Sequence, residues 1–554
     1  MLSSDKQLVQ FVVSAMVHYQ ITKVVISPGS RNSAFAIAFD GHPQIETLVV
    51  HDERCAAFIA LGWAQQSAAP VALCCTSGSA CLNYYPAIAE AYYRNIPLLA
   101  LTADRPAKWI NQGDGQTIVQ QDVFKNHVHA YLEFDEDHFV PNHDHTHNVS
   151  TFLKHLHSDW KGPIHLNVGL NEPLYNLAEF SSFSFPSIDS KSIQNQRIDF
   201  KQIEGQKIMI LIGQMDHHAL LEQILGRIAD HSNVVVLVEN TSNLRHPLFN
   251  HCIDRSLNLI DASNSEYHPQ VLISLGGAVV SKRIKAFLRQ VKLNFHWRVA
   301  ADFPQMNTYG LLSACYSMNP VDFFKQLDDA QICLNTHNFQ GKWKALDYQA
   351  KDQQAQFKTD QNHLTDYDVF ESLNHLISTT CNLHLANSSV VRYAQLFDPH
   401  PNISYHSNRG TSGIDGTVST AVGAALASPE QNHILICGDT SFIYDSNALW
   451  TTPFPKNLKI IVIDNQGGGI FQIIAGPSTS PLREKYFEAT HTKSPGKIAQ
   501  GFGFEVLYCS EKIKLEKTLQ SFLADEQIQI MEISTAKDKN ASTLQDFFNF
   551  IKTH

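Results

Sequence analysis

Short apolar runs recur along the chain, and each run stops at a cluster of small and polar residues. In the first third, runs at 23–26, 46–50, 71–75 and 97–102 alternate with segments whose apolar residues recur at helical spacing. Buried parallel strands give short unbroken apolar runs, and the helices that cross between them give the longer period. The pattern therefore predicts repeated strand–helix units in a doubly wound parallel sheet.

The same alternation continues through the rest of the chain and breaks at two polar stretches. A Ser-rich stretch at 181–194 is typical of a linker, and a Gln- and Lys-rich stretch at 335–362 has the helical spacing of a surface connector. We therefore expect three doubly wound parallel-sheet α/β domains, bounded at 1–180, 195–334 and 363–554.

A buried strand predicted at 434–437 ends at Gly438-Asp439, and a helix predicted at 442–450 follows it. Thr440 and Ser441 are suitable N-cap residues for that helix. The start of such a helix offers free N–H groups, which bind anions such as a diphosphate.

A second buried strand, predicted at 458–463, ends in Asp464-Asn465-Gln466 followed by three glycines. The Asp439 carboxylate, the Asn465 amide oxygen and the carbonyl near Gly467 would form an all-oxygen set at two strand ends. Such a set suits Mg²⁺, which also keeps phosphate oxygens and water as ligands. On these residues alone, an ordinary turn followed by a flexible glycine loop is an equally good interpretation.

Glu53 follows the strand predicted at 46–50 and begins an almost wholly apolar helix. Its carboxylate would enter a dry environment, which raises the pKa of a carboxyl group. A carboxyl of that kind can hydrogen-bond a heterocyclic nitrogen and transfer a proton. The simpler alternative is that Asp52 and Glu53 are first-turn acids stabilised by the helix dipole.

Basic residues follow predicted strands in both the first and the last domain. Four arginines share this position: Arg31, Arg105, Arg392 and Arg409. Because arginine binds carboxylates in a bidentate manner, the set predicts a substrate with several carboxylates, although any single one could be a surface residue. Lys282 and Arg283 begin a helix of the middle domain, where a solvated helix end is the default interpretation.

A His- and Asp-rich segment at 135–157 includes His143-Asp144-His145-Thr146-His147. His-rich tracts bind metals in some proteins. No Cys or Glu completes a tetrahedral set here, so a solvated loop is the favoured interpretation.

Composition narrows the protein class. At 554 residues, with 44% apolar and 17% charged residues, the chain is typical of a soluble multidomain protein. A net charge of −11 argues against a general nucleic-acid binder. Ten scattered cysteines without a CxxC pair indicate reduced thiols. The chain has no signal-peptide pattern and no apolar run long enough to span a membrane, so we expect a cytoplasmic protein.

Seven motifs lie across nearly the whole chain: SPGSRNSAF, HDERCAAFIALGWA, TSGSA, LTADRP, NSSVVR, SNRGTSGIDG and GGGIF. Together they resemble the thiamine diphosphate-dependent enzymes of the decarboxylase type, which have a pyrimidine-binding, a middle and a diphosphate-binding domain. Within that family they are most similar to the branch that decarboxylates 2-oxoglutarate and adds the succinyl unit to isochorismate in menaquinone biosynthesis. The set is far more specific than the Asp439 and Asn465 pair alone.

The resemblance implies roles for individual residues. Glu53 would hydrogen-bond the aminopyrimidine of the cofactor, and Ile414 would be the apolar wedge that bends it. The cofactor-binding residues implied are Glu53, Ser77, Gly78, Ser412, Gly413, Ile414, Gly438, Asp439, Thr440, Ser441, Asn465, Gly467, Gly468, Ile470 and Phe471. Mg²⁺ (or Mn²⁺) would be held by Asp439, Asn465 and the Gly467 carbonyl.

The resemblance also implies a substrate site. Substrate carboxylates and hydroxyls would be bound by Arg31, Arg105, Gln116, Lys282, Ser388, Arg392 and Arg409, with Ile470, Phe471 and Ile474 as pocket walls. The catalytic group would comprise Glu53, Gln116, Arg392 and Arg409. The cofactor would supply an electron sink for the loss of carbon dioxide. Because the family builds each active site between two subunits, a homodimer or homotetramer is implied.

Two positions depart from the family pattern. Gly115 stands where an asparagine is common, so one polar substrate contact is in doubt. Asp464 precedes Asn465 where two asparagines are usual, which adds a negative charge beside the expected metal loop.

Three alternatives stay open at this point. The first is another enzyme of the same cofactor group, such as acetolactate synthase or a 2-oxoacid decarboxylase, which the several arginines disfavour. The second is a non-catalytic binding protein, against which the presence of Glu53 and Asp439 argues. The third is a flavin or nicotinamide oxidoreductase, for which the turns at Gly213 and Gly276 lack the GxGxxG fingerprint.

Overall fold

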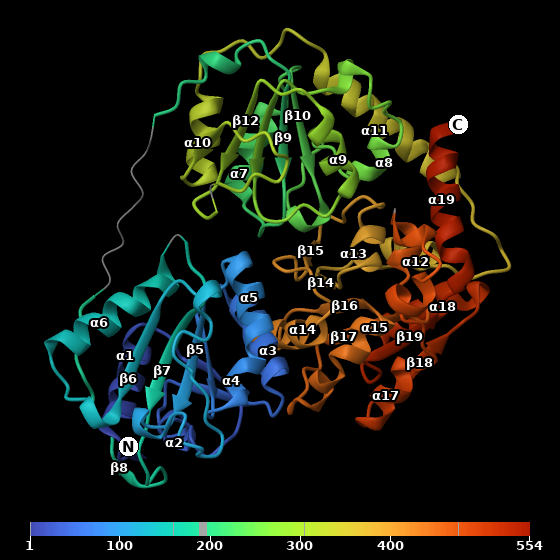
Figure 1. Cartoon of the computed structure of the whole chain (residues 1–554). Coiled ribbons are helices and arrows are strands. Elements are labelled where there is room, and N and C mark those ends of the chain that lie inside the picture. Colours follow the sequence, from blue (N-terminus) through green and yellow to red (C-terminus); the bar gives the residue numbers. More distant parts are fainter. Residues whose placement is uncertain (1, 159, 188–196, 304, 475, 554) are drawn as a thin grey trace. The chain divides into compact units, whose positions relative to one another are not determined.

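A computed structural model describes residues 2–158, 160–187, 197–303, 305–474 and 476–553 (Figure 1). The chain divides into two compact units. The first consists of Met1–Lys191, Gly410–His433 and Tyr444–Leu458; the second consists of Ser192–Arg409, Ile434–Ile443 and Lys459–His554. None of the described helices is both long enough and apolar enough to cross a membrane.

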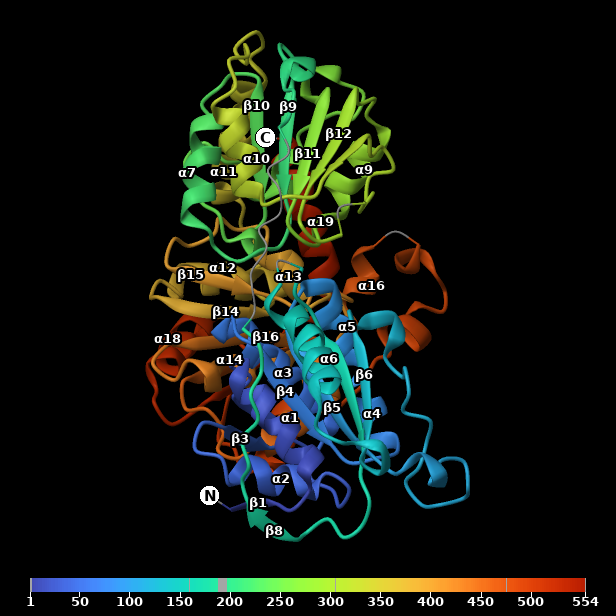
Figure 2. The same cartoon turned by 90° about the vertical axis from the view of Figure 1, so that its left-hand side faces the viewer.

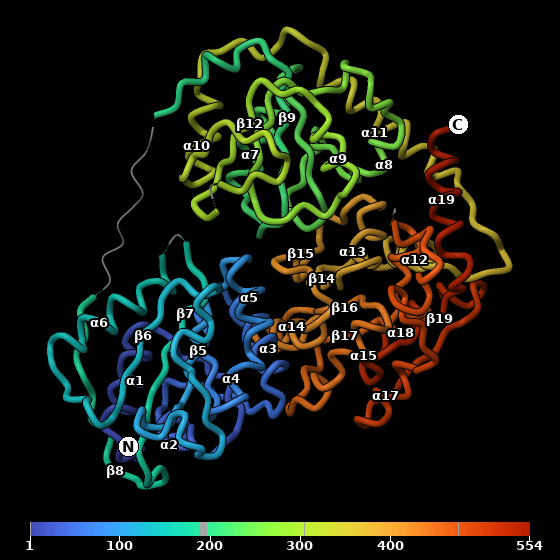
Figure 3. The backbone as a smooth tube through the Cα atoms, in the orientation of Figure 1, coloured from blue at the N-terminus to red at the C-terminus, as the bar shows by residue number. Residues whose placement is uncertain are grey.

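The first unit is built around a six-stranded sheet whose paired strands are all parallel (Figures 1 and 3). The strand order is β3 (Glu46–Val49), β2 (Lys23–Ile26), β4 (Val71–Cys75), β5 (Leu98–Asp104), β7 (Ile164–Gly169) and β6 (Tyr131–Asp135). β4 and β5 are buried along their whole length, as their unbroken apolar runs predict. A short antiparallel ribbon joins β1 (Leu2–Ser4) and β8 (Leu177–Glu179).

Helices cover both faces of this sheet. One apolar core packs α1 (Gln7–His18), α2 (Ser33–Asp40) and α6 (His143–Leu153) against the strands. The helices α3 (Glu53–Ser67), α4 (Ser79–Asn83) and α5 (Tyr85–Arg94) contact one another, and α3 also packs on β4. The sheet is therefore covered on both sides, as a doubly wound sheet requires.

Helix α14 (Thr417–Ala427) belongs to the first unit and packs closely against α3. Two glycines permit the approach, since a Cβ on Gly62 would lie 2.0 Å from the Thr420 carbonyl oxygen. A Cβ on Gly423 would lie 1.9 Å from the Ile59 carbonyl oxygen. Each helix therefore needs a glycine where the backbone of the other passes.

The second unit contains two further sheets (Figures 1 and 2). The five-stranded parallel sheet has the order β10 (Val234–Val238), β9 (Ile208–Ile212), β11 (Val271–Leu275), β12 (Phe295–Val299) and β13 (Ala314–Tyr316). Alternate residues of β9 enter different cores, with Ile208, Ile210 and Ile212 in one and Met209 and Leu211 in the other. Both faces of this sheet are thus covered.

The six-stranded sheet carries the C-terminal motifs. Its order is β15 (Ile403–His406), β14 (Cys381–Leu385), β16 (His433–Gly438), β17 (Leu458–Asp464), β19 (Ile530–Ser534) and β18 (Val506–Cys509). The remaining α-helices are α7 (Ala219–Ile228), α8 (Ile253–Leu257), α9 (Lys282–Gln290), α10 (Pro320–Asp328), α11 (Phe339–Gln356), α12 (Asp366–Leu376), α13 (Ser389–Ala394), α15 (Asp439–Tyr444), α16 (Ile470–Ile473), α17 (Pro495–Gly501), α18 (Leu515–Ala524) and α19 (Lys537–Thr553). The fold class predicted from the apolar runs is confirmed.

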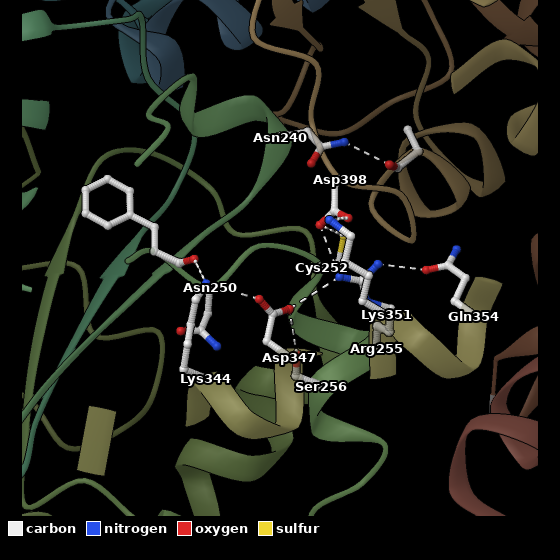
Figure 4. Close-up of polar contacts among 12 residues, drawn as sticks. Asn240, Asn250, Cys252, Arg255, Ser256, Lys344, Asp347, Lys351, Gln354 and Asp398 are labelled. Carbon is white, nitrogen blue, oxygen red and sulfur yellow. Dashed lines mark hydrogen bonds and ion pairs between the residues drawn. The ribbon is translucent and has the colours of Figure 1, made fainter. Parts of the chain in front are cut away.

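A buried arginine connects elements of the second unit that are far apart in sequence (Figure 4). Arg255 of α8 lies 3.3 Å from Asp347 of α11 and 3.1 Å from Asp398, and it donates to Gln354 at 2.7 Å. These charge-assisted contacts hold the pKa of Asp398 down at about 2, against the opposing effect of burial. The stretch at 335–362, predicted as a surface connector, is thus a helix with one buried face.

Two local predictions were wrong: the helix at 442–450 and the loop in the His-rich segment at 135–157. The helix predicted at 442–450 begins at Asp439 and ends at Tyr444, and a 3₁₀ turn at Ser446–Trp450 follows it. The break lies at Asp445, whose buried carboxylate accepts hydrogen bonds from Ser419 instead of facing solvent.

The His-rich segment predicted as a loop is also helical, since α6 begins at His143. The Asn142 side chain caps it by accepting from the His145 N–H at 2.8 Å, and its apolar residues Val149, Phe152 and Leu153 are buried. Among the described residues, no group of three or more His, Cys, Asp or Glu side chains could hold a metal. All ten cysteines are free thiols; eight of them are buried, whereas Cys315 and Cys333 are exposed. The linker predicted at 181–194 lies partly outside the described residues.

Replacing Gly62 by alanine tests the close approach of α3 and α14. The new methyl group would meet a backbone oxygen that cannot move without shifting the whole helix, so we expect the free energy of unfolding to fall by about 3 kcal/mol. Chemical unfolding followed by circular dichroism measures this. Gly501→Ala is the control, because a Cβ there meets no atom within 4 Å. Equal stability of the two variants would contradict the packing argument.

Candidate active site

Five of the residues implied in substrate or cofactor binding lie together at the carboxyl ends of β2, β4 and β5. We call Arg31, Ser77, Gly78, Arg105 and Gln116 the first half-site. The Ser77 hydroxyl donates to the Gln116 carbonyl at 2.8 Å, and a Cβ on Gly78 would lie 3.1 Å from the same residue. Gln116 itself has a φ of 53°. Neighbouring parallel strands thus bring motifs far apart in sequence to one edge.

The two arginines of the first half-site are close enough to interact. Burial and the charge of Arg105 both lower the pKa of Arg31. Arg31 forms an ion pair with Glu172 at 3.0 Å, and Arg105 forms one with Asp114 at 2.9 Å. Arg105 also donates to the Gly115 carbonyl at 3.0 Å, so the residue that departs from the family pattern contributes through its backbone.

Glu53 is the first residue of α3, and its side chain is half-buried. Burial raises the pKa of its carboxyl group, and the neighbouring charge of Asp52 acts in the same direction. Asp52 has a separate role, because it caps α3 through the Cys55 N–H at 3.0 Å. Asp52 is thus the N-cap of α3, and Glu53 is its first-turn acid, half-buried and with a raised pKa.

The flanks of Glu53 are tied to the segment after α15. The Asp52 carboxylate accepts from the Asn447 amide at 2.8 Å, and Arg54 donates to the Tyr444 carbonyl at 2.7 Å. Arg54 also lies over the Tyr444 ring at 4.5 Å. These contacts fix the turn that presents Glu53.

The loop that carries Ile414 also belongs to the first unit. The buried Glu90 of α5 accepts from the backbone N–H groups of Gly410 at 2.8 Å and Thr411 at 2.6 Å. A Cβ on Gly416 would lie 2.1 Å from the Phe58 ring of α3, which explains the glycine and its φ of 69°. Ile414 is 36% exposed at the tip of this anchored loop.

The second unit holds the remaining basic residues. Arg392 of α13 donates to the Ser388 carbonyl, and Arg409 donates to the Asn387 amide oxygen at 2.7 Å. The Asn387 amide in turn donates to the Asn408 carbonyl at 2.6 Å, which joins the ends of β14 and β15. We call Lys282, Ser388, Arg392 and Arg409 the second half-site. Lys282 is exposed at the first residue of α9.

The three expected metal ligands lie at the ends of β16 and β17. The buried Asp439 carboxylate accepts from the Gly467 N–H at 2.9 Å, so these two residues are in direct contact. The Asn465 amide nitrogen donates to the buried Asp366 at 3.0 Å, which leaves its carbonyl oxygen available to a cation. Gly467 has a φ of 140°, in a region that only glycine adopts without strain.

These residues fit a magnesium diphosphate. Their donor set is carboxylate, amide oxygen and backbone carbonyl, the hard ligands that Mg²⁺ prefers. A Cβ on Gly438 would meet no atom within 4 Å, so a ligand can approach the backbone there. Helix α15 begins at Asp439 rather than after Ser441, so the expected metal ligand Asp439 lies in its first turn.

The extra carboxylate, Asp464, lies against Asp439. Burial and the charge of Asp439 raise the pKa of Asp464 to about 6, and burial raises the pKa of Asp439 as well. His491 lies 3.6 Å from the Asp439 carboxylate. The substitution of the usual asparagine therefore increases the negative charge at the metal loop.

The expected apolar wall residues lie just after the three glycines: Ile470 and Phe471 are in α16, and Ile474 is the residue that follows this helix. Ile470 is buried, whereas Phe471 and Ile474 are partly exposed. The Phe471 ring packs on Phe487 at 6.0 Å. The Gly468 N–H donates to the Glu488 carbonyl at 2.7 Å, which holds the glycine loop to the segment that follows.

Several residues that support the site were missed in the sequence. Glu90, Asp366 and Asp445 are buried carboxylates, each of which accepts a hydrogen bond from a segment distant in sequence. Nothing in the sequence marks them, because acidic residues are usually solvent-exposed. Strained backbone marks the motifs more clearly, because Gln116, Ser388, Ser412 and Gln466 all have positive φ.

Comparisons with known proteins agree with this geometry. Residues 6–127 match the family model of the thiamine pyrophosphate enzyme N-terminal TPP-binding domain, and residues 387–533 match that of the C-terminal TPP-binding domain. Three curated relatives bear the name 2-succinyl-5-enolpyruvyl-6-hydroxy-3-cyclohexene-1-carboxylate synthase. They come from Flavobacterium johnsoniae (38% identity; 98% of each chain), Bacteroides fragilis (34%; 100% of each chain) and Desulfotalea psychrophila (38%; 91% of this chain and 94% of the relative).

The chain belongs to this synthase family. The family resemblance inferred from the seven motifs is confirmed, and the chain is a thiamine diphosphate-dependent enzyme. The N-terminal TPP-binding segment contains Glu53 and all five residues of the first half-site. The C-terminal segment contains the loops of Asp439 and Asn465.

Replacing Asp464 by asparagine tests the carboxylate pair. The raised pKa of Asp464 means that its ionisation opposes folding above about pH 6, and that this penalty disappears below the pKa of the unfolded chain, near 4. In metal-free protein we therefore expect Asp464→Asn to be more stable by about 1 kcal/mol at pH 8 after solvent screening, and equally stable at pH 4. Thermal unfolding across this pH range measures the difference.

The matched control is Asp546→Asn, which changes an exposed aspartate of α19. Its effect on stability at each pH gives the reference from which the effect of Asp464→Asn is measured. If Asp464→Asn behaved in the same way, the repulsion between Asp464 and Asp439 would be excluded.

Proposed function

We propose that this enzyme decarboxylates 2-oxoglutarate and transfers the resulting succinyl unit to isochorismate, giving 2-succinyl-5-enolpyruvyl-6-hydroxy-3-cyclohexene-1-carboxylate for menaquinone biosynthesis. The observation that carries the proposal is the placement of basic residues at strand ends in both units, in a chain whose relatives bear that name over their full length. The two substrates bring four carboxylates, and cationic side chains bind such groups. The five cationic residues concerned are Arg31, Arg105, Lys282, Arg392 and Arg409.

Glu53 is the proton-transferring residue in this proposal. Its half-buried carboxyl has a raised pKa, so it holds a proton more readily than an exposed glutamate and can share it with a heterocyclic nitrogen. The contacts of Asp52 and Arg54 on either side limit its movement. Thiamine diphosphate, when bound, supplies the electron sink that decarboxylation requires.

The arginines bind and orient the anions. Arg392 and Arg409 are anchored by a backbone carbonyl and an amide oxygen, so their positions are set before a substrate arrives. Arg392 is half-buried, and this burial lowers the pKa of its guanidinium. A carboxylate bound in such a place is held more strongly than at an exposed arginine. Ile470, Phe471 and Ile474 would exclude water from the same pocket.

Asp439, Asn465 and the Gly467 carbonyl would hold Mg²⁺ or Mn²⁺, and the cation would bind the cofactor's diphosphate. Asp366 supports this by fixing the Asn465 amide. We further propose that the protein acts as a cytoplasmic homodimer or homotetramer, in which active sites form between subunits. Size-exclusion chromatography with light scattering tests the assembly.

The reaction is tested by following isochorismate with 2-oxoglutarate, thiamine diphosphate and Mg²⁺, omitting each in turn. We expect consumption only when all three are present. Faster turnover of pyruvate than of 2-oxoglutarate, with isochorismate untouched, would favour another 2-oxoacid decarboxylase or acetolactate synthase.

Glu53→Gln tests the proton transfer. Glutamine keeps the shape but cannot exchange the proton, so we expect carbon dioxide release to fall by about a hundredfold or more. Calorimetric titration should show thiamine diphosphate binding within a few-fold of the unchanged protein. Glu46→Gln, which alters an exposed glutamate of β3, is the control. Undiminished turnover by Glu53→Gln would remove this role.

Arg392→Ala tests anion binding. Loss of the guanidinium should raise the KM for at least one substrate by about tenfold or more, with a smaller change in kcat. Arg227→Ala, which removes a half-exposed arginine paired with Asp328, is the control. An unchanged KM for both substrates would exclude Arg392 from the site.

A further inference from the structure

A buried turn of the five-stranded domain touches three of the elements that carry basic residues. The turn, Glu239–Asn243, follows β10, and all five of its residues are buried. It has its own capping box, in which the Glu239 N–H donates to the Ser242 hydroxyl at 2.8 Å. Its conformation is therefore set locally, and its remaining side chains are available to hold other elements.

The Glu239 side chain holds the entrance to α9. One carboxylate oxygen accepts from the Val280 N–H and the other from the Ser281 N–H, both at 2.7 Å. Ser281 caps α9 by accepting from the Ile284 N–H at 3.0 Å, and it donates to Asp254 of α8. Two carboxylates thus fix the first turn of α9, which carries Lys282.

The rest of the turn reaches the other two elements. The Asn240 amide donates to the carbonyl of Ala394, the last residue of α13, at 2.8 Å (Figure 4). The Asn243 amide donates to the Tyr405 carbonyl at 3.0 Å and accepts from the Tyr405 N–H at 2.8 Å. Since α13 carries Arg392 and β15 leads to Arg409, the turn is bonded to every element of the second half-site that bears a cation.

Lys285 extends this arrangement. It lies three residues after Lys282 on α9 and is half-buried, whereas Lys282 is exposed. It also lies four residues after Ser281, whose N–H is bound by Glu239 at 2.7 Å, so it shares the face of α9 that meets the buried turn. Its charge interacts favourably with Glu239 and unfavourably with Arg409, Arg289 and Arg392. Arg283 points to a different neighbour, because it stacks over the Phe548 ring at 3.9 Å and donates to Asn258. Arg289, farther along the helix, is occupied by the Thr308 carbonyl, to which it donates at 2.9 Å. Lys285 is thus the α9 cation on the face that meets the turn.

We propose that Glu239 is a positioning residue for anion binding, which holds α9 so that Lys285 joins Arg392 and Arg409 as a further cation for a substrate carboxylate. The proposal rests on the function proposed above and adds one binding residue and its support. Withdrawn partly from water beside two arginines, Lys285 is stabilised when an anion binds among the three charges. Glu239 does not touch the substrate in this scheme and acts through the backbone of α9.

The test compares KM and kcat for Glu239→Gln, Lys285→Met and the double variant, with both substrates. Glutamine can accept only one of the two N–H bonds, because its NH₂ group faces the second donor. We expect each single variant to raise the KM for one and the same substrate by about tenfold, with kcat and thiamine diphosphate affinity changed much less. The double variant should be little worse than either, because both changes remove one interaction.

Two matched controls separate positioning from general stability. Glu532→Gln alters another buried carboxylate that accepts a backbone N–H, from Gly496 at 2.6 Å. Lys207→Met alters a partly buried lysine of the same domain, which donates to the Ser265 carbonyl. Both should leave each KM unchanged, although Glu532→Gln should lower the melting temperature.

The outcomes distinguish this inference from the proposed function. Turnover by the unchanged protein, with unaltered KM values in Glu239→Gln and Lys285→Met, would overturn the inference and leave the function standing. Absence of turnover by the unchanged protein would contradict the function. In that case, thermal unfolding of the cofactor-free protein with 2-oxoglutarate or isochorismate tests the anion site. Protection of the unchanged protein that is lost in both Glu239→Gln and Lys285→Met would support the site. Equal protection of the unchanged protein and both variants would overturn it.

Discussion

The close approach of α3 and α14 is the constraint on which the first unit depends. Gly62 and Gly423 let the two backbones pass at a distance that no other residue would allow. Helix α3 begins with Glu53, and α14 follows the loop that carries Ile414. Because interiors are packed as tightly as crystals, a shift of one helix would move both functional segments together. The relative position of Glu53 and Ile414 therefore depends on Gly62 and Gly423, neither of which is an expected ligand of the cofactor.

Buried carboxylates perform the corresponding task elsewhere. Glu90 holds the loop before Ile414, and Asp445 holds the start of α14 through Ser419. In the second unit, Asp366 orients Asn465, and Glu239 holds the entrance to α9. A buried carboxylate is costly unless it is fully hydrogen-bonded, so each one demands a single arrangement of its donors. That cost appears in raised pKa values, about 7 for Glu239 and about 6 for Asp366 and Asp445, where burial opposes ionisation.

The difference between what the sequence predicted and what it missed has a physical origin. Short apolar runs predicted β2 and β4 to the residue, because a strand buried on both faces leaves no other pattern. The site motifs were found because strand ends carry unusual residues in a short stretch. The supporting carboxylates were missed since Glu90 or Glu239 looks like any helix or turn acid until its partner, more than 40 residues away, is known. Strand β8 is short and largely exposed, and it has no apolar run to reveal it.

At Asp445 a contact with a distant residue, Ser419, overrides the local preference of the sequence for a helix. The sequence favoured a helix through Trp450, but the Asp445 carboxylate bonds instead to the Ser419 N–H at 2.7 Å. Two hydrogen bonds to a buried carboxylate outweigh the small propensity of one helical turn. The break also frees the Tyr444 carbonyl and the Asn447 amide for the flanks of Glu53.

The arginines of the two half-sites differ in what an incoming anion must replace. Arg31 and Arg105 form ion pairs with Glu172 and Asp114, which are 65% and 39% exposed and can swing into water at little cost. Arg392 is anchored by a carbonyl within its own helix region, and its more distant carboxylate neighbours, Asp254 and Glu239, are held by backbone and hydroxyl donors. If the proposed function holds, a substrate carboxylate would therefore exchange with a mobile acid in the first unit but would add to a fixed charge pattern in the second. The second unit would then hold its anion in the more sharply defined orientation.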